Sequence, residues 1–290
     1  MRLTHPDKVL WADVGLTKQN LAEYYAAHAD LILPHLKDRP LSIVRCPEGA
    51  KGECFFQKHG NPSTPKSIDT VSIREKDGSK AQYLVVRSRE ALVSTAQIGA
   101  LELHVWGCRI DEIEKPERIV FDLDPDEGLN FDDVKEAAFE VRDVLASVGL
   151  ESFPMITGGK GVHVIVPIAR RNDWVEVKTF AHGFSEKLAA ASPNRYVVNM
   201  SKKKRKGRIF LDYLRNERGS TAIVPYSPRR RDGAPVATPV SWAELGRIDK
   251  ASKFTMENLD ARLKGQKRDP WPGYFSQKQT LTAKIRNAFA

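Results

Sequence analysis

The sequence has few cysteines and no long hydrophobic segment. Its 290 residues include only three cysteines, Cys46, Cys54 and Cys108. This odd number, without a close Cys-x-x-Cys pair, does not indicate a zinc site, so we expect reduced, structural cysteines. No run reaches the roughly 18 uncharged apolar residues of a membrane-spanning helix, and Met1–Pro6 lacks the apolar core of a signal peptide. We expect a cytoplasmic protein.

The chain also lacks a Walker A motif and any internal repeat. Thr157–Gly161 reads Thr-Gly-Gly-Lys-Gly, so a glycine follows Lys160 where the Walker motif has a serine or threonine hydroxyl. A P-loop nucleotide site is therefore not expected. The glycines could still bring backbone N–H groups close to a phosphate, with Lys160 as a point charge, although a plain glycine hairpin is an equally simple interpretation.

What is present is a globular composition with excess positive charge. Hydrophobic residues make up 41% and charged residues 29% of the chain, which is long enough for one large core or two modest ones. The net charge is +9 and favours a polyanionic partner such as nucleic acid. Basic residues are concentrated at 202–208 and 229–231, although both segments could be solvated loops.

Strand-like and helix-like segments alternate along most of the chain. Periodic apolar residues predict helices from about Thr17, ended by Pro34 and Pro40, and at 90–98, 131–145, 174–190 and 256–263. Apolar runs predict strands at 41–45, 81–86, 101–106, 119–123, 154–156, 162–166 and 209–214. The pattern predicts an α/β or mixed α+β fold.

Two acidic residues end an otherwise apolar strand. Asp122 and Asp124 are two positions apart and should project from the same face, where their charges repel unless a cation lies nearby. A turn could also explain this pair. Asp212, in a second apolar strand, favours the other interpretation: three carboxylates can hold two metal ions roughly 3.5 to 4 Å apart for phosphoryl displacement.

Other residues gain weight only from their context. His163 follows the glycine loop and could donate to a phosphate, whereas His104, Arg215 and Arg229 taken alone could be structural or surface residues. Phe55 and Phe56 lie in a segment, 46–65, that we expect to be a loop. With Lys51, Lys58 and His59 around them, the two rings could contact one unpaired nucleic-acid strand.

These segments together resemble the polymerase domain of bacterial ATP-dependent DNA ligase D, in the archaeo-eukaryotic primase superfamily. The resemblance runs from about Arg2 to Trp271. It is carried by His5-Pro-Asp-Lys-Val-Leu-Trp11, Phe55-Phe-Gln-Lys58, Phe121-Asp-Leu-Asp-Pro125, Thr157-Gly-Gly-Lys-Gly-Val-His163 and Phe210-Leu-Asp-Tyr-Leu-Arg215. Thr157 stands where the family more often has serine, and the hydroxyl is kept.

The resemblance implies a role for each group of residues. Asp122, Asp124 and Asp212 would be catalytic and hold two metal ions, Mn²⁺ or Mg²⁺. The incoming NTP or dNTP would contact His104, Thr157, Lys160, His163, Arg215 and Arg229. Lys8 and Lys18 would bind the 5′-phosphate downstream of a DNA gap or break, and Phe55 and Phe56 would contact the template.

The resemblance also implies a fold and a setting. We expect an N-terminal α/β module at about 1–115, an RRM-like catalytic module at about 116–235 and a C-terminal helical extension at about 236–290. The activity would be template-directed gap filling and terminal transfer, preferring ribonucleotides, in bacterial non-homologous end joining at the nucleoid. Ku and an ATP-dependent DNA ligase would be partners, and the chain would be an excised domain or a free-standing polymerase.

Two further hypotheses remain open at this point. The same three carboxylates could activate water in a metal-dependent nuclease or phosphohydrolase. The chain could also be a DNA-end-binding module without catalysis, although its intact acidic residues argue against that.

Overall fold

The protein divides into two compact units, seen in a computed structural model that describes residues 3–290. The first unit comprises the chain up to Asp111 with Thr221–Ala237 and Phe254–Leu263; the second comprises Glu112–Ser220, Thr238–Lys253 and Lys264–Ala290. No helix within residues 3–290 is long and apolar enough to span a membrane.

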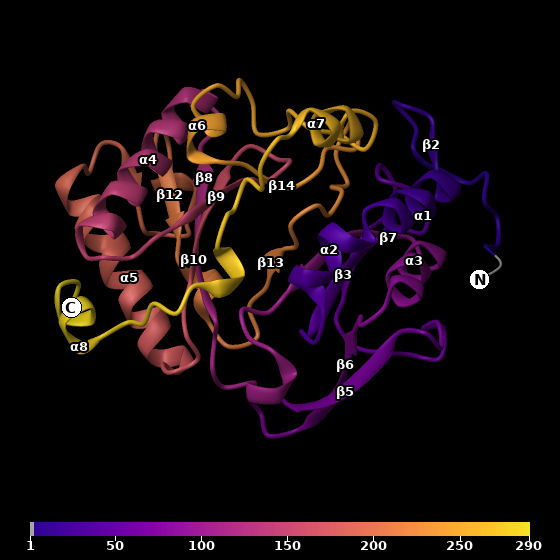
Figure 1. The fold of residues 1–290 in the computed structure, drawn as a ribbon, viewed down its shortest axis with the longest axis horizontal. Coiled ribbons are helices and arrows are strands. Elements are labelled where there is room, and N and C mark those ends of the chain that lie inside the picture. Colours follow the sequence, from indigo (N-terminus) through magenta and orange to yellow (C-terminus); the bar gives the residue numbers. More distant parts are fainter. Residues whose placement is uncertain (1–2) are drawn as a thin grey trace. The chain divides into compact units, whose positions relative to one another are not determined.

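The first unit is a sheet packed with helices (Figure 1). Its strands follow the order β13-β7-β3-β6-β5, with β4 paired to β3; their bounds are β3 Leu41–Arg45, β4 Phe55–Gln57, β5 Asp69–Arg74, β6 Lys80–Val85, β7 Ala100–Val105 and β13 Ala222–Ile223. The helices are α1 Lys18–Ala27, α2 Ala29–Leu36 and α3 Arg89–Gln97, and β1 Val9–Trp11 pairs with β2 Leu16–Thr17.

The helix expected from Thr17 to Pro34 is two helices. The first helix begins next to Thr17, as predicted, and Thr17 caps it because its side chain accepts the backbone N–H of Asn20. His28 then ends α1 and precedes α2. Pro34 does not end the second helix but lies inside it, two residues before its last residue. The expectation for Pro34 was therefore wrong, and the chain leaves the helix only at Lys37.

The second unit has the alternation β-α-β-β-α-β. Its strands are β8 Arg118–Pro125, β9 Phe153–Ile156, β10 Val162–Pro167, β11 Tyr196–Val197, β12 Ile209–Asp212 and β14 Thr238–Pro239, in the order β11-β12-β8-β10-β9-β14. β10 is inserted antiparallel between β8 and β9, the split β-α-β arrangement, which confirms the predicted mixed α+β fold with an RRM-like module.

Two long helices cover one face of this second sheet. They are α4, Phe131–Ser147, and α5, Trp174–Ala191, and both pack against β8 (Figure 1). Each begins with a capping box, Asn130 with Asp133 and Asp173 with Glu176, which satisfies the free N–H groups of the first turn. Their apolar stripes, such as Val134, Ala138 and Val141 in α4, are fully buried, as the sequence predicts.

The division into units differs from the expected modules. Residues 221–235, expected in the catalytic module, belong to the first unit because β13 pairs with β7. The expected C-terminal extension at 236–290 is shared between both units. Besides β14, it contains short helical segments: α6 Trp242–Leu245, α7 Leu259–Gly265, the 3₁₀ turn Tyr274–Ser276 and α8 Ala283–Asn287.

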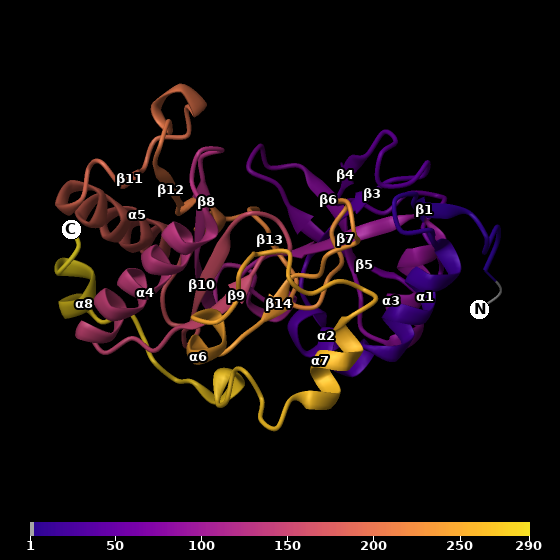
Figure 2. The ribbon, with the colours of Figure 1, turned by 90° about the horizontal axis from the view of Figure 1, so that it is seen from above.

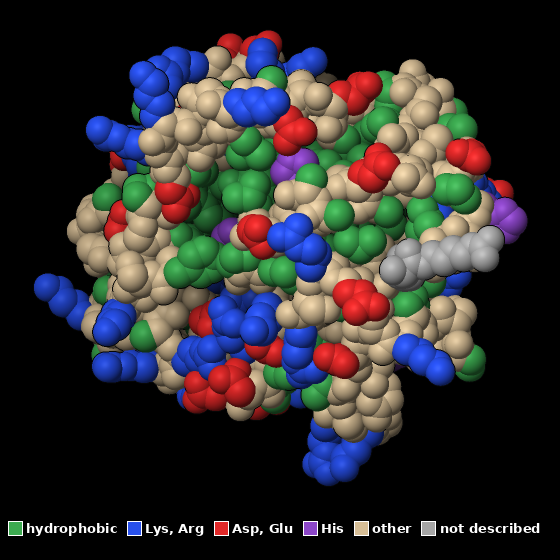
Figure 3. All heavy atoms as spheres, turned by 45° about the vertical axis from the view of Figure 1, so that its right-hand side comes forward, with side chains coloured by type: hydrophobic (Ala, Val, Ile, Leu, Met, Phe, Trp, Pro, Cys, Tyr) green, Lys and Arg blue, Asp and Glu red, His purple; other side chains and the backbone are tan. Residues whose placement is uncertain are grey.

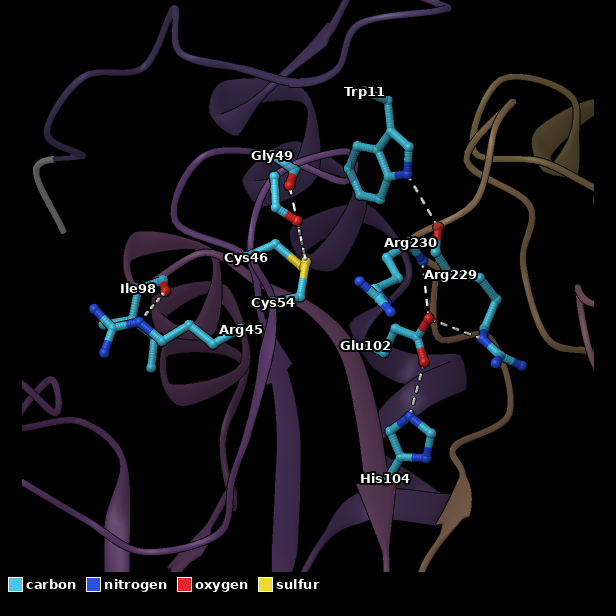
Figure 4. The surroundings of a disulfide bond; sticks show 11 residues. Trp11, Arg45, Cys46, Gly49, Cys54, Ile98, Glu102, His104, Arg229 and Arg230 are labelled. Atoms are coloured by element: carbon cyan, nitrogen blue, oxygen red, sulfur yellow. Dashed lines mark hydrogen bonds and ion pairs between the residues drawn. A yellow bond between two sulfur atoms is a disulfide. The ribbon is translucent and has the colours of Figure 1, made fainter.

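Two of the three cysteines form a disulfide. Cys46 and Cys54 are bonded, with their Cα atoms 4.3 Å apart (Figure 4). Cys108 is buried and takes no part in a disulfide. The expectation of three reduced cysteines was wrong because it considered only spacing along the chain. The pairing of Arg45 with Phe55 in β3 and β4 brings the next residue on each side, Cys46 and Cys54, opposite one another.

Reduction of this disulfide should destabilise the first unit. The bridged cysteines are eight residues apart, and closing a loop of that length stabilises a fold by about 2 to 3 kcal/mol through the entropy of the unfolded chain. We expect dithiothreitol to lower the free energy of unfolding by this amount in urea titrations. The Cys108→Ser variant should show the same sensitivity to dithiothreitol. Three free thiols in the unreduced protein by mass spectrometry would contradict the bridge.

Candidate functional site

The two acidic residues of β8 lie on the face of the sheet opposite the helices. The ring of Phe121 contacts that of Phe184 in α5, with centroids 4.6 Å apart, so Phe121 faces the helices. Because successive strand residues point to opposite faces, Asp122 and Asp124 project from the other face. The strand thus turns one side to the core under the helices and places both carboxylates on the side that α4 and α5 do not cover, which we call the open face.

Strand register brings two more site residues beside Asp122. Asp122 in β8 pairs with His163 in β10 on one side and with Asp212 in β12 on the other. Directly paired residues of antiparallel strands point to the same face with their Cβ atoms roughly 5 Å apart. His163, Asp122 and Asp212 therefore form a row across three neighbouring strands, and we call it the acidic row. Asp124 stands at the end of β8, opposite Phe210.

Two arginines hold the carboxylates of this site. Arg215, which follows β12, has Nη2 3.2 Å from Asp122 Oδ2 and Nε 3.2 Å from Asp212 Oδ2. Arg205 donates from Nη1 to Asp124 Oδ2 at 3.0 Å, and its guanidinium lies 3.9 Å from the ring centre of Phe210. The structure thus places Arg215 at the acidic row, as expected, and adds Arg205.

The arginines do not fully balance the negative charge. Burial raises the pKa of Asp212 above its ordinary value, and the charge of Asp122 raises it further, against the opposing effect of Arg215. The pKa of Asp124 is also raised, by burial and then by Asp122. Both carboxyl groups therefore favour the proton, or another cation, more than an isolated aspartate does.

The donor set suits a divalent metal ion. Within residues 3–290, no three His, Cys, Asp or Glu side chains are arranged to hold a metal as they stand. The carboxylates of Asp122, Asp124 and Asp212 are instead paired with arginines. Hard carboxylate oxygens on one open face, with raised proton affinity, are the ligands that Mg²⁺ and Mn²⁺ prefer. A divalent ion would take the place of guanidinium charge at Asp122, Asp124 and Asp212.

The glycine loop between β9 and β10 closes on itself. The Thr157 hydroxyl donates to the Gly161 carbonyl at 2.9 Å and accepts the Gly159 N–H at 3.3 Å. A Cβ on Gly161 would lie 2.3 Å from the Leu123 carbonyl oxygen, so only glycine allows the loop to approach β8 this closely. The loop therefore lies beside the strand that carries the acidic residues.

The loop's other polar side chains are placed differently from Thr157. Lys160 is about half exposed, with Nζ 3.9 Å from Glu127 Oε1. His163 is buried, and its Nε2 lies 3.4 Å from Asp122 Oδ1. The Nδ1 atom of His163 is buried without a hydrogen-bond partner among the described residues. Lys160 and His163 thus keep polar atoms that a ligand could use.

The remaining nucleotide candidates, His104 and Arg229, belong to the first unit. Both contact Glu102, a buried residue two positions before His104 on β7 (Figure 4). His104 Nε2 lies 2.9 Å from Glu102 Oε2, and Arg229 Nε lies 3.1 Å from Glu102 Oε1. The structure therefore brings His104 and Arg229 together through a carboxylate that sequence reasoning did not identify.

Phe55 and Phe56 lie in a strand, not in the expected loop. They form β4 with Gln57, where Phe56 pairs with Val44 and Phe55 with Arg45 of β3. Strand alternation points the two rings to opposite faces. Phe56, 61% exposed, lies 5.2 Å from the His104 ring, whereas Phe55 lies beside the Arg45 guanidinium. The expectation that a loop turns both rings to one side was wrong.

Lys8 and Lys18 are brought together by the β1–β2 pair. The backbone N–H of Lys18 donates to the Lys8 carbonyl at 2.8 Å. Lys8 Nζ lies 2.8 Å from Glu48, and the buried Lys18 Nζ donates to the Thr4 carbonyl at 2.8 Å. Burial lowers the pKa of Lys18, and the charge of Lys8 lowers it further. An anion placed between the two ammonium groups would relieve that repulsion.

The basic run is a projecting 3₁₀ turn. Lys202–Lys204 form this turn between β11 and β12, and all three lysines are exposed; Figure 2 shows the segment standing out from the second unit. Positive charge is not confined to it, because Lys and Arg alternate with Asp and Glu over the face that Figure 3 shows. Arg205, at the end of the turn, is the member that reaches the acidic site.

Sequence reasoning missed Arg205 and Glu102 for different reasons. Arg205 was counted as one charge of a basic run, and only the β8–β12 pairing shows that it reaches Asp124. Glu102 could have been identified from the sequence, because it stands between Leu101 and Leu103 in an apolar strand; both faces of that strand are buried. A carboxylate at such a position requires partners, as Asp122 does.

Fold and site together define a class. Carboxylates in register on the open face of a split β-α-β sheet, beside a glycine loop, are typical of enzymes that transfer phosphoryl or nucleotidyl groups. Comparisons with known proteins identify the member of that class. A model of the LigD primase-polymerase domain matches residues 17–271.

Curated relatives and a solved structure agree with this match. The multifunctional non-homologous end joining protein LigD of Pseudomonas aeruginosa is 38% identical over 287 residues, which cover 99% of this chain and 34% of that protein. The bifunctional LigD of Bacillus subtilis is 30% identical over 92% of this chain and 43% of its own length. The polymerase domain of Mycobacterium tuberculosis ligase D, solved in complex with DNA, has a TM-score of 0.84 and 31% identity, covering 92% of this chain and 95% of that one.

The chain belongs to the LigD primase-polymerase family, and it is a nucleotidyltransferase by class. It spans about a third of the length of the Pseudomonas relative. Membership implies dependence on a divalent metal ion.

Charge removal at the acidic row should stabilise the metal-free protein. Burial raises the pKa of Asp212 in the folded state, so folding favours the protonated form of this side chain. Its contribution to the free energy of unfolding is therefore fully present below about pH 4, the pKa of an unperturbed aspartate, and is lost as the pH rises through the folded-state pKa. In the presence of a chelator, Asp212→Asn should therefore unfold at higher urea concentration than the wild type at pH 7. The two proteins should converge in acid, and a variant less stable than the wild type at pH 7 would refute this.

Proposed function

We propose that this chain adds nucleotides to the 3′-hydroxyl of a DNA primer, both along a template and without one. It would fill gaps at broken ends in non-homologous end joining. The acidic row is the observation that carries this proposal, because it gathers Asp122 and Asp212 on an open sheet face with Asp124 beside them. The family match supplies the reaction class.

The proposed chemistry is in-line displacement at the α-phosphate of the incoming nucleotide. Two divalent ions bound by Asp122, Asp124 and Asp212 would lower the pKa of the 3′-hydroxyl and neutralise charge on the leaving pyrophosphate. Arg215, which contacts Asp122 and Asp212 from one side, orients both carboxylates. In the metal-free protein it also supplies positive charge to the acidic row, which the metal ions would replace.

We propose nucleotide contacts for the six residues that the family resemblance names. In the second unit, Lys160 provides an exposed ammonium group, His163 a free ring nitrogen and Arg215 a guanidinium. Thr157 acts through the shape of the glycine loop, since its hydroxyl is bonded within that loop. We propose the same role for His104 and Arg229. Phe56, whose ring lies tilted beside that of His104 with the centroids 5.2 Å apart, is proposed as a platform for a template base. Phe55 is proposed as the second template contact.

The remaining features of the proposal rest on the family resemblance. They are a preference for ribonucleotides, a preference for Mn²⁺, cooperation with Ku and an ATP-dependent DNA ligase, and a place at the bacterial nucleoid.

Primer extension tests the proposed activity. With Mn²⁺, nucleotides and a labelled primer-template, the wild type should lengthen the primer, and Asp122→Asn should lower the rate by at least about 100-fold because the central ligand loses its charge. Asp126→Asn is the matched control, since Asp126 follows the same strand but accepts the Gly207 N–H outside the acidic row. Primer shortening without extension would indicate a nuclease instead.

Recognition of a downstream 5′-phosphate should depend on the paired lysines. We expect Lys8→Ala and Lys18→Ala to weaken binding to a gapped duplex about tenfold when the downstream strand carries a 5′-phosphate, and to have little effect without it. Fluorescence anisotropy at fixed salt measures both affinities. Lys80→Ala removes an exposed lysine elsewhere in the same unit and should affect both substrates equally. Equal losses on both substrates for Lys8→Ala and Lys18→Ala would refute the assignment.

A further inference from the structure

Glu102 is a buried carboxylate with a complete set of positively charged and N–H partners. It is 4% exposed. One oxygen, Oε1, lies 3.1 Å from Arg229 Nε and accepts the backbone N–H of Arg230 at 2.9 Å. The other, Oε2, lies 2.9 Å from His104 Nε2. Figure 4 shows Glu102 between the imidazole ring on one side and the arginine segment on the other.

The partners of Glu102 favour the ionised form of its carboxyl group. Burial alone would raise the pKa of Glu102, but the hydrogen bond from His104 and the charge of Arg229 lower it to about 2. Glu102 is therefore an anion at any working pH. Its oxygen can only accept, so His104 must donate from Nε2, which leaves Nδ1 on the far side of the ring.

The surroundings fix the cluster from every direction. Phe56 of β4 covers the imidazole ring, with centroids 5.2 Å apart. Tyr25 of α1 also lies near Glu102. Burial raises the pKa of the Tyr25 hydroxyl, and the negative charge of Glu102 raises it further, so Tyr25 stays neutral and donates to the Ala100 carbonyl. Trp11, fully buried, donates from Nε1 to the Arg229 carbonyl at 3.0 Å. The strand residues opposite Glu102 and His104 are uncharged: Val44, Ser42 and Ile223.

We propose that Glu102 is a positioning residue that holds His104 doubly protonated and Arg229 in a fixed direction, so that both present positive charge to the incoming nucleotide's triphosphate. The inference rests on the proposed nucleotide-binding role of His104 and Arg229. A neutral imidazole whose Nε2 proton is donated to Glu102 has only a lone pair at Nδ1 and would repel a phosphate oxygen. The buried carboxylate stabilises the imidazolium, in which Nδ1 becomes a donor.

The pH dependence of nucleotide binding distinguishes positioning from mere packing. Glu102→Gln keeps the size of the side chain but removes its charge. An opposite charge within hydrogen-bonding distance shifts the pKa of a group by about one unit or more. In the Glu102→Gln variant, the His104 ring should therefore lose its second proton at a pH lower by at least that amount than in the wild type. The rise in the KM for the nucleotide should then be about tenfold larger at pH 8 than at pH 6, where only the lost contact with Arg229 contributes, and kcat at saturating nucleotide should stay nearly constant.

Two variants serve as controls. Glu75→Gln removes another carboxylate of the same sheet that lies 3.1 Å from a histidine nitrogen, that of His59, and it should leave the pH profile of KM unchanged. His104→Asn removes the titrating ring, so adding Glu102→Gln to it should produce no further pH-dependent change. A pH-dependent loss that persists in the double variant would show that Glu102 does not act through His104.

A measurement on the wild type needs neither a variant nor catalysis. In ¹⁵N-edited NMR spectra of the DNA-free protein, the His104 ring should carry protons on both nitrogens at pH 7. A neutral ring at pH 7, or an unchanged KM at pH 8 in folded Glu102→Gln, would overturn the proposal. Failure of the proposed function would appear differently, as a wild type that extends no primer while its His104 titration still depends on Glu102.

Discussion

The register of β8 between β10 and β12 is the constraint on which the candidate active site depends. Because Asp122 is paired with His163 on one side and Asp212 on the other, a shift by one residue would turn one of these side chains into the helix-covered core. The buried contact of Phe121 with Phe184 fixes which face is which. Packing of the apolar side of the strand thus determines where the carboxylates point.

Each unit contains a partly buried cluster of acidic and basic side chains. In the second unit, Arg215 and Arg205 offset three crowded carboxylates, yet burial still raises the pKa of Asp212 and Asp124. In the first, the single carboxylate of Glu102 offsets His104 and Arg229. The site in the second unit therefore has a deficit of positive charge and suits metal ions, whereas the cluster in the first unit has one carboxylate between two basic side chains. In the second unit, folding holds like charges together at a cost in stability that a ligand can relieve.

Much of this could be predicted from the sequence, because local patterns encode local structure. The apolar run ending in Asp122-Leu123-Asp124 and the apolar stripes of α4 and α5 indicated the elements that the structure contains. The two arms of the split β-α-β unit followed from the family resemblance. Asp212 was assigned to the acidic site before its pairing with Asp122 was known.

What could not be predicted depends on pairing between distant segments. The bridge between Cys46 and Cys54, and the strand that contains Phe55 and Phe56, both require the register of β3 with β4, which no spacing along the chain reveals. The return of residues 221–237 to the first unit likewise follows from one short strand, β13. Arg205 and Glu102 acquire their roles only from such long-range contacts.

The central claim is that Asp122, Asp124 and Asp212 are the ligands of catalytic divalent ions. The most direct measurement is anomalous diffraction from crystals grown with Mn²⁺ and a non-hydrolysable nucleoside triphosphate. The account predicts manganese peaks within coordination distance of the carboxylates of Asp122 and Asp212, with Asp124 turned from Arg205 toward the metal. Manganese bound elsewhere, or a triphosphate held with Arg205 and Arg215 still on all three carboxylates, would contradict it.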